Sequence, residues 1–185
     1  MKRLMLFLVC LSYKGYCEEE RWSWIIKGEE SLQMFVDSYE QKHDASILYT
    51  VGWSYAKLGE DAIAVDYFNQ YLSEEHSPMN RKQLETFIYR FERARQETNL
   101  PYLFVSAERA YQENRYDEAI RKARHFLRFM RRDEPMYERA WRTVGMSACV
   151  LNEDLLAQYA YEKVGERGRW AMKSICLKAN NIVLP

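Results

Sequence analysis

Hydrophobic residues recur along most of the chain at intervals of three or four positions, with polar residues between them. This spacing is typical of helices that bury one face, and it predicts helices over residues 29–42, 44–58, 60–74, 80–97, 101–113, 116–131, 135–151, 153–165 and 169–180. No run of alternating apolar and polar residues between turn residues indicates a strand. We therefore expect an all-α fold for this chain of 185 residues.

Two stretches of the chain carry the same order of large and small residues. They are Leu48, Gly52, Ala64, Phe68 in the first and Trp141, Gly145, Ala157, Tyr161 in the second. A glycine inside a helix costs about 0.5–1 kcal/mol relative to alanine. Gly52 and Gly145 therefore indicate that a second helix approaches closely, with Ala64 and Ala157 as the expected points of contact. A third copy around Phe104, Ala107 and Ala119 is less regular.

On these residues the chain resembles the tetratricopeptide repeat (TPR) family, whose unit of about 34 residues is a helical hairpin. Leu48 and Trp141 match the tryptophan position of the family, and Gly52 and Gly145 match its glycine. The resemblance implies a right-handed α-solenoid of antiparallel helix pairs, closed by capping helices at its ends. The C-terminal cap is expected over residues 169–180, through Trp170, Ile175 and Leu177.

The amphipathic helix predicted over residues 80–97 does not carry the repeat pattern. Its apolar face contains Leu84, Phe87, Ile88, Phe91 and Ala94. We expect an extra element that interrupts regular stacking of the helix pairs.

In the TPR family, the first helix of each pair lines a concave groove that binds peptides or partner helices. The resemblance assigns eight residues to this groove: Tyr49, Trp53, Phe104, Glu108, Tyr111, Arg139, Arg142 and Met146. Aromatic residues and arginine often anchor protein interfaces. For Tyr49, Phe104 and Met146, packing in the core remains an open alternative.

A second candidate surface is a row of arginines on and just after the helix predicted over residues 116–131. It consists of Arg121, Arg124, Arg128, Arg131 and Arg132. Such a cationic face can contact anionic lipid, lipopolysaccharide or nucleic acid. The alternative is a solvated face whose charge is compensated by Glu118, Asp133 and Glu134.

Residues 1–17 have the composition of an export signal: Lys2 and Arg3, an apolar run over residues 4–11, and small residues before Glu18. The alternative is an N-terminal helix packed on the repeats. Cleavage removes three basic residues and no acid, so the formal net charge changes from zero to about −3, which argues against a dedicated nucleic-acid binder. We expect residues 18–185 to form one domain that is periplasmic or secreted, with an N-terminal cap around Trp22 and Trp24.

Two cysteines, Cys149 and Cys176, remain after cleavage. An oxidising compartment would allow them to pair. The repeat register places them at different heights on neighbouring helices, so we expect two buried free thiols.

The sequence contains none of the common catalytic or phosphate-binding motifs. We therefore expect neither enzyme activity nor a cofactor or metal ion. The leading hypothesis is a non-catalytic scaffold of the bacterial cell envelope that binds a protein or peptide in its groove. The alternatives are a structural subunit that self-associates and a helical accessory domain of an enzyme. Membrane association is possible but not expected.

Overall fold

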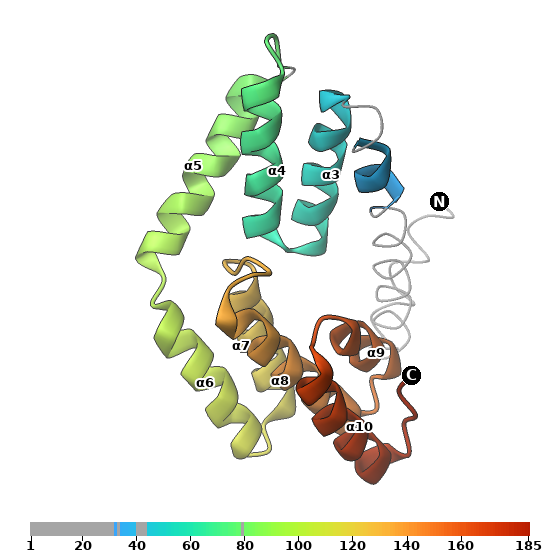
Figure 1. Cartoon of the computed structure of the whole chain (residues 1–185). Coiled ribbons are helices and arrows are strands. Elements are labelled where there is room, and N and C mark those ends of the chain that lie inside the picture. Colours follow the sequence, from blue (N-terminus) through green and yellow to red (C-terminus); the bar gives the residue numbers. More distant parts are fainter. Residues whose placement is uncertain (1–31, 33, 40–43, 79) are drawn as a thin grey trace, which may run out of the picture.

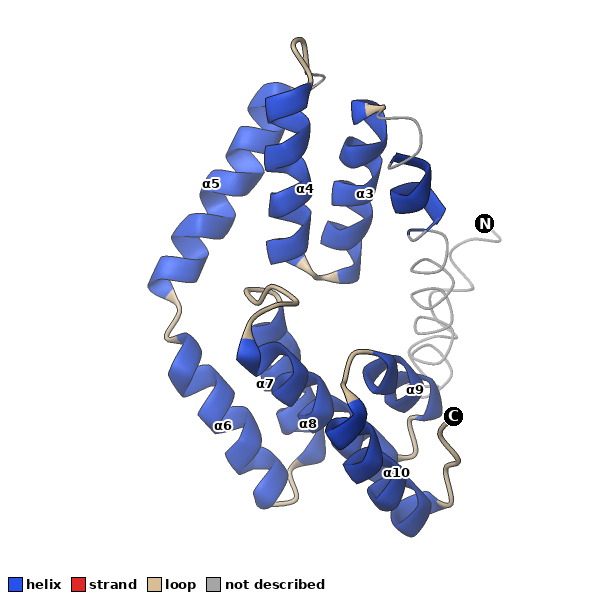
Figure 2. Cartoon of the chain, in the orientation of Figure 1, coloured by secondary structure: helices blue, strands red, loops and turns tan. Residues whose placement is uncertain are grey.

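The computed structural model describes residue 32 and residues 34–39, 44–78 and 80–185, which are mostly helical and contain no strand (Figure 2). Its helices are α3 (Ala45–Leu58), α4 (Asp61–Glu74), α5 (Arg81–Glu97), α6 (Leu100–Gln112), α7 (Tyr116–Leu127), α8 (Pro135–Leu151), α9 (Asp154–Glu162) and α10 (Glu166–Asn180). Residues 34–39 are also helical. The all-α prediction is confirmed. The expected export signal and the N-terminal cap lie outside the described residues.

Three helical hairpins, α3–α4, α6–α7 and α8–α9, share one turn geometry. Each turn has a residue in the left-handed region: Gly59 with φ 80°, Asn114 with φ 60° and Asn152 with φ 63°. The N–H of the next residue then donates to a carbonyl five positions back, at 3.0, 2.8 and 2.9 Å respectively. This bond closes the C-terminus of a helix in a Schellman motif. The same local structure therefore occurs three times in the chain.

Gly52 and Gly145 lie where helices pack closely, as expected. A methyl group at position 52 would lie 2.6 Å from Cδ1 of Phe68, and one at position 145 would lie 2.9 Å from Sδ of Met172 and 3.0 Å from Cβ of Ala160. The predicted contact points Ala64 and Ala157 are therefore not the nearest neighbours of these glycines. Both alanines are nevertheless fully buried.

The described helices form two groups with a hydrophobic cluster in each. Helices α3, α4 and α5 lie together, and α6 to α10 form the second group, with α5 leading into α6 along one edge (Figure 1). Within the second group, α8 packs against α6, α7, α9 and α10. Ala62 and Val65 of α4 belong to the cluster of the second group, so the two groups are in contact. None of the described helices has the length and apolar character needed to cross a membrane.

Helix α7 ends at Leu127, four residues before the predicted end. The carbonyl of Arg128 accepts a hydrogen bond from the N–H of Ala62 in α4, at 3.0 Å. Phe129 and Met130 are buried after the chain has left the helix. Contacts with α4 thus occupy the residues that would have continued α7.

A C-terminal helix, α10, is present where the cap was predicted, but it buries a different face from the one expected. Met172 and Cys176 of α10 are fully buried, whereas Trp170 is 76% exposed and Leu177 is 56% exposed. Helix α10 packs against α8 and presents the tryptophan outward.

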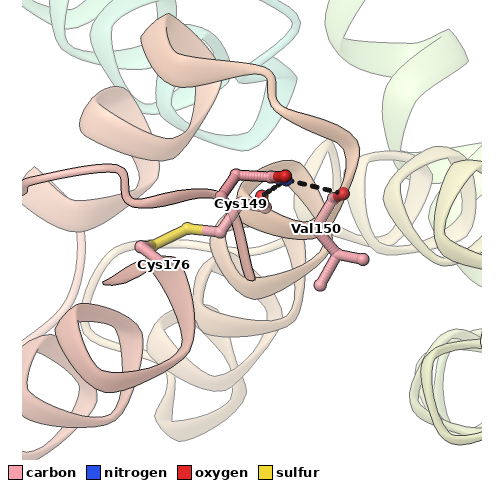
Figure 3. The surroundings of a disulfide bond; sticks show 4 residues. Cys149, Val150 and Cys176 are labelled. Atoms are coloured by element: carbon pink, nitrogen blue, oxygen red, sulfur yellow. Dashed lines mark hydrogen bonds between the residues drawn. A yellow bond between two sulfur atoms is a disulfide. The ribbon is translucent and has the colours of Figure 1, made fainter. Parts of the chain in front are cut away.

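Cys149 in α8 and Cys176 in α10 form a disulfide, with their Cα atoms 4.7 Å apart (Figure 3). The side-chain amide of Asn180 donates to the carbonyls of Cys149 and Val150, at 2.7 and 3.0 Å. The prediction of two free thiols was wrong. Helix α10 packs on α8 in a register that brings the two cysteines opposite each other, rather than at different heights.

The disulfide closes a sequence separation of 27 residues, and we predict that its reduction lowers the free energy of unfolding by about 3–4 kcal/mol through the entropy of the unfolded chain. Urea denaturation with and without reductant measures this change. The double variant Cys149→Ala and Cys176→Ala is the control, since its stability should not respond to reductant. An unchanged wild-type midpoint on reduction would contradict the prediction.

Candidate interaction site

In the first hairpin, the predicted groove residue Trp53 contacts helix α5, and Tyr49 contacts the residue just before that helix. The ring of Trp53 lies 5.6 Å from the ring of Phe87 in α5 and 5.1 Å from that of Phe68 in α4, measured between centroids. The side-chain amide of Asn80, just before α5, donates to the hydroxyl of Tyr49 at 3.1 Å. The extra helix is thus accommodated beside these two residues, where it covers part of their face.

The structure brings three other predicted residues together where α6 meets α8. The carboxylate of Glu108 accepts a hydrogen bond from Arg139 at 2.8 Å. The guanidinium of Arg139 also lies over the ring of Phe104, 5.1 Å from its centroid. Phe104 itself is buried and packs on Phe126, so it belongs to the core beneath this surface.

The remaining predicted groove residues are partly accessible. Tyr111 is one turn of α6 beyond Glu108 and contacts Tyr116 edge to face. Arg142 and Met146 follow Arg139 at the helical spacing that keeps residues on one side of α8, and both are half-buried. We name Glu108, Tyr111, Arg139, Arg142 and Met146 the α6–α8 face.

The five predicted cationic residues divide into two sets. Arg121, Arg124 and Arg128 line a pocket beside α7. Arg131 and Arg132 do not line this pocket, but like Arg128 they reach the first hairpin. The guanidinium of Arg131 bonds the carboxylate of Asp66 at 2.9 Å, and that of Arg132 bonds the hydroxyl of Tyr55 at 3.1 Å.

Two of the acids expected to compensate these arginines bond other side chains, although Glu134 also accepts a hydrogen bond from the backbone N–H of Arg131 at 3.1 Å. Glu118 bonds Lys122 at 2.7 Å and also Arg115, and Glu134 bonds Arg95 at 3.1 Å. Three of the five arginines, Arg128, Arg131 and Arg132, instead face acids of α4 and its preceding turn, which lie more than sixty residues away in the chain.

Acidic residues at the start of α4 form the centre of the contact between the two helix groups. Asp61 accepts from Nε and Nη2 of Arg128 at 3.0 and 2.7 Å. Glu60 is 4% exposed, accepts from the hydroxyl of Tyr159 at 3.1 Å and lies 3.8 Å from Arg132. We call Glu60, Asp61, Arg128, Arg132 and Tyr159 the docking cluster.

Burial controls the ionisation of this region. It raises the pKa of Glu60, while the positive charge of Arg132 and the hydrogen bond from Tyr159 act in the opposite direction. Burial also raises the pKa of Tyr159 far above its usual value and lowers the pKa of Lys163, 4.0 Å from Glu60, to about 8. A buried carboxylate is costly unless it is paired with a positive charge and hydrogen-bonded. Burial of Glu60 therefore favours the docked position of the first hairpin, where Arg132 supplies the charge and Tyr159 the hydrogen bond.

The pocket beside α7 has a volume of about 410 Å³ and lies between the end of α3 and the helix α7. Its cationic lining residues are Lys57, Arg121, Arg124 and Arg128, and His125 also lines it. Its base contains the side chains of Leu58, Leu127, Trp141 and Tyr159. We call it the cationic pocket. Guanidinium groups arranged in this way can bind carboxylate or phosphate oxygens.

Lys57 and Glu60 were not among the site residues predicted from the sequence. The signal that could have found Glu60 is the pair of acids, Glu60 and Asp61, directly after the tight turn at Gly59, together with the arginine-rich stretch 128–132. Opposite charges in two such segments are compatible with a contact between them, but the sequence contains no direct measure of their distance.

Within the described ranges, no group of three histidine, cysteine or acidic side chains is placed to hold a metal ion. Comparison with known protein families, with curated proteins and with solved structures found no match to this chain.

Because Asp61 is largely buried, its pairing with Arg128 should contribute more than an exposed pair. Unfolding free energies of Asp61→Asn, Arg128→Gln and the double variant should give a coupling energy of about 1 kcal/mol. Arg81 and Glu85 on the exposed side of α5, 3.6 Å apart, provide a control cycle with an expected value below about 0.5 kcal/mol. Equal coupling in both cycles would show that the docking pair has no special role.

Proposed function

We propose that the chain is a TPR-like scaffold of the bacterial cell envelope, which binds a protein partner and catalyses no reaction. The observation that carries this proposal is the threefold recurrence of one helical hairpin, with the same left-handed residue and the same closing hydrogen bond in each turn. Recurring hairpins that pack on their neighbours are typical of repeat proteins, and such proteins commonly offer extended binding surfaces.

The packing of the second helix group supports a solenoid arrangement as part of the proposal. The first helices of successive hairpins, α6 and α8, contact each other, and α10 packs against α8 in the place of a further first helix. In this proposal α5 is the inserted element that separates the first hairpin from the other two, and the stack has the right-handed twist of the family.

Export from the cytoplasm is supported by the Cys149–Cys176 disulfide. Disulfides form and persist in oxidising compartments such as the bacterial periplasm and are rare in the cytosol. Together with the signal-like composition of residues 1–17, the disulfide favours a periplasmic or secreted protein.

The α6–α8 face is the partner-binding surface in this proposal. It combines arginine, tyrosine and methionine side chains, which are enriched at protein interfaces. Arg142 and Met146 lie beside the Glu108–Arg139 ion pair, whose arginine side chain is 51% exposed. A partner helix or peptide on this face would bury the side chain of Met146. The nearby charges of Glu108 and Arg139 would define the orientation of the partner.

One observation favours the alternative of a self-associating subunit. Trp170 and Leu177 are seven residues apart on the outer side of α10, and both are exposed. In a stack of repeats this side would receive the next helix pair. Assembly through α10 predicts an oligomer that dissociates in the variant Trp170→Glu.

The test is affinity capture from the native envelope, quantified by mass spectrometry. We expect one envelope protein to be enriched by the wild-type chain and its recovery to fall at least about tenfold with Arg142→Glu and Met146→Glu combined. Arg167→Glu in α10 with Tyr89→Glu in α5 is a control at exposed positions outside this face and should retain capture. Light scattering on each variant reports the oligomeric mass, which should not change.

Capture that is unaffected by the paired substitution on the α6–α8 face would contradict the proposed binding surface. Loss of the oligomer in Trp170→Glu, with no envelope protein captured by the wild type, would instead support the self-associating subunit.

A further inference from the structure

The basic residues of the cationic pocket come from two parts of the chain that are distant in sequence. Lys57 and Leu58 come from the end of α3, and Arg121, Arg124 and Arg128 come from α7 and its C-terminal end. Docking of the first hairpin at Glu60 and Asp61 fixes the distance between these two walls. The pocket therefore exists only in the docked arrangement of the two helix groups.

The charges of the pocket are only partly neutralised by the described residues. Arg128 is paired with Asp61, and Glu60, the acidic lining residue, already accepts a hydrogen bond from Tyr159 and faces Arg132. Lys57 is exposed at the rim, as is Arg121. Lys57 and Arg121 thus place positive charge at the mouth of the pocket, where it attracts anions.

The spacing of the arginines indicates how many anionic groups fit. Arg121, Arg124 and Arg128 follow one another at three and four positions, so they share one side of α7, and the row extends about 10 Å along the axis. A single phosphate group cannot contact both ends of such a row. Acidic side chains on alternate residues of an extended peptide are about 7 Å apart and match it better.

The shape of the site favours a peptide over a membrane surface. The arginines lie beside the wall formed by the end of α3, and Trp141 and Tyr159 contribute to the base between the walls. A peptide segment can enter this recess and place carboxylates against guanidinium groups, which bind carboxylates with two parallel hydrogen bonds. A flat bilayer would meet the rim alone.

On the premise that the chain is the interaction scaffold described above, we propose that the cationic pocket binds an acidic segment of a partner protein through at least two of its carboxylates. Arg121 and Lys57, whose side chains are exposed, contact the segment at the mouth of the pocket, and Arg128, which remains paired with Asp61, lies beside them. This site is separate from the α6–α8 face, so a partner can occupy both.

The test is the binding of a fluorescein-labelled hexaglutamate peptide to the full chain, followed by fluorescence anisotropy. We expect saturable binding that weakens as salt is raised from about 0.05 M to about 0.3 M, since the contacts are largely exposed to solvent. Lys57→Gln with Arg121→Gln should weaken binding at least about tenfold. Both side chains are exposed, so the variant should keep the wild-type unfolding midpoint.

Arg167→Gln with Lys178→Gln removes the same charges from exposed positions of α10 and should leave the affinity within about twofold. Labelled hexaglutamine should not bind. The proposal is overturned if hexaglutamate fails to bind at low salt, or if the pocket variant and the control bind it equally.

Two competing ligands provide further decisive outcomes. Inorganic phosphate that displaces the peptide at a similar concentration would identify a small-anion site and overturn the proposal. The second competitor is a vesicle of phosphatidylglycerol. If the chain floats with these vesicles through Lys57 and Arg121 but does not bind hexaglutamate, the site binds membranes and the proposal is overturned. Envelope capture through the α6–α8 face uses other residues, so it can succeed where this titration fails.

Discussion

The contact between the α3–α4 turn and the end of α7 determines how the two helix groups are arranged. At this contact Glu60 is buried against Tyr159, Asp61 pairs with Arg128, and the N–H of Ala62 donates to the carbonyl of Arg128. Buried and half-buried charges have strict geometric requirements because an unpaired one is costly. The docking cluster thus selects one relative position of the groups, in addition to the hydrophobic contacts of Ala62 and Val65.

Helix α5 explains why the two groups meet through charged contacts. In the second group, neighbouring hairpins pack side by side through α7 and α8. The first hairpin instead has α5 beside α4, with Phe87 against Trp53. Because α5 takes a face that regular stacking would use, the first hairpin meets the second group mainly through its turn. The cationic pocket is the space left beside that contact, between α3 and α7.

Much of the secondary structure could be predicted from the sequence because it depends on local signals. Helical periodicity located α5 within one residue of its observed start, and Gly52 and Gly145 marked two places where helices pack closely. The early end of α7 could not be predicted in this way, because its cause is a hydrogen bond to Ala62, far away in the chain.

The interaction surfaces were harder to predict for the same reason. The TPR resemblance selected residues of α6 and α8 that do meet, namely Phe104, Glu108 and Arg139, since these depend on packing between similar hairpins. It carried no information on α5, which contacts Trp53, or on the α10 register that joins Cys149 to Cys176. Both depend on elements outside the repeat pattern.

Native-state hydrogen exchange at the amide of Ala62 tests the docked arrangement most directly. The first N–H groups of a helix have no partner within that helix, so Ala62 is protected only if it donates to Arg128 across the contact. We expect its exchange to be at least about a hundredfold slower than that of Asp117, which occupies the same position in α7. Equally fast exchange at both amides would show that the first hairpin is not docked in solution, and would contradict the arrangement on which the cationic pocket depends.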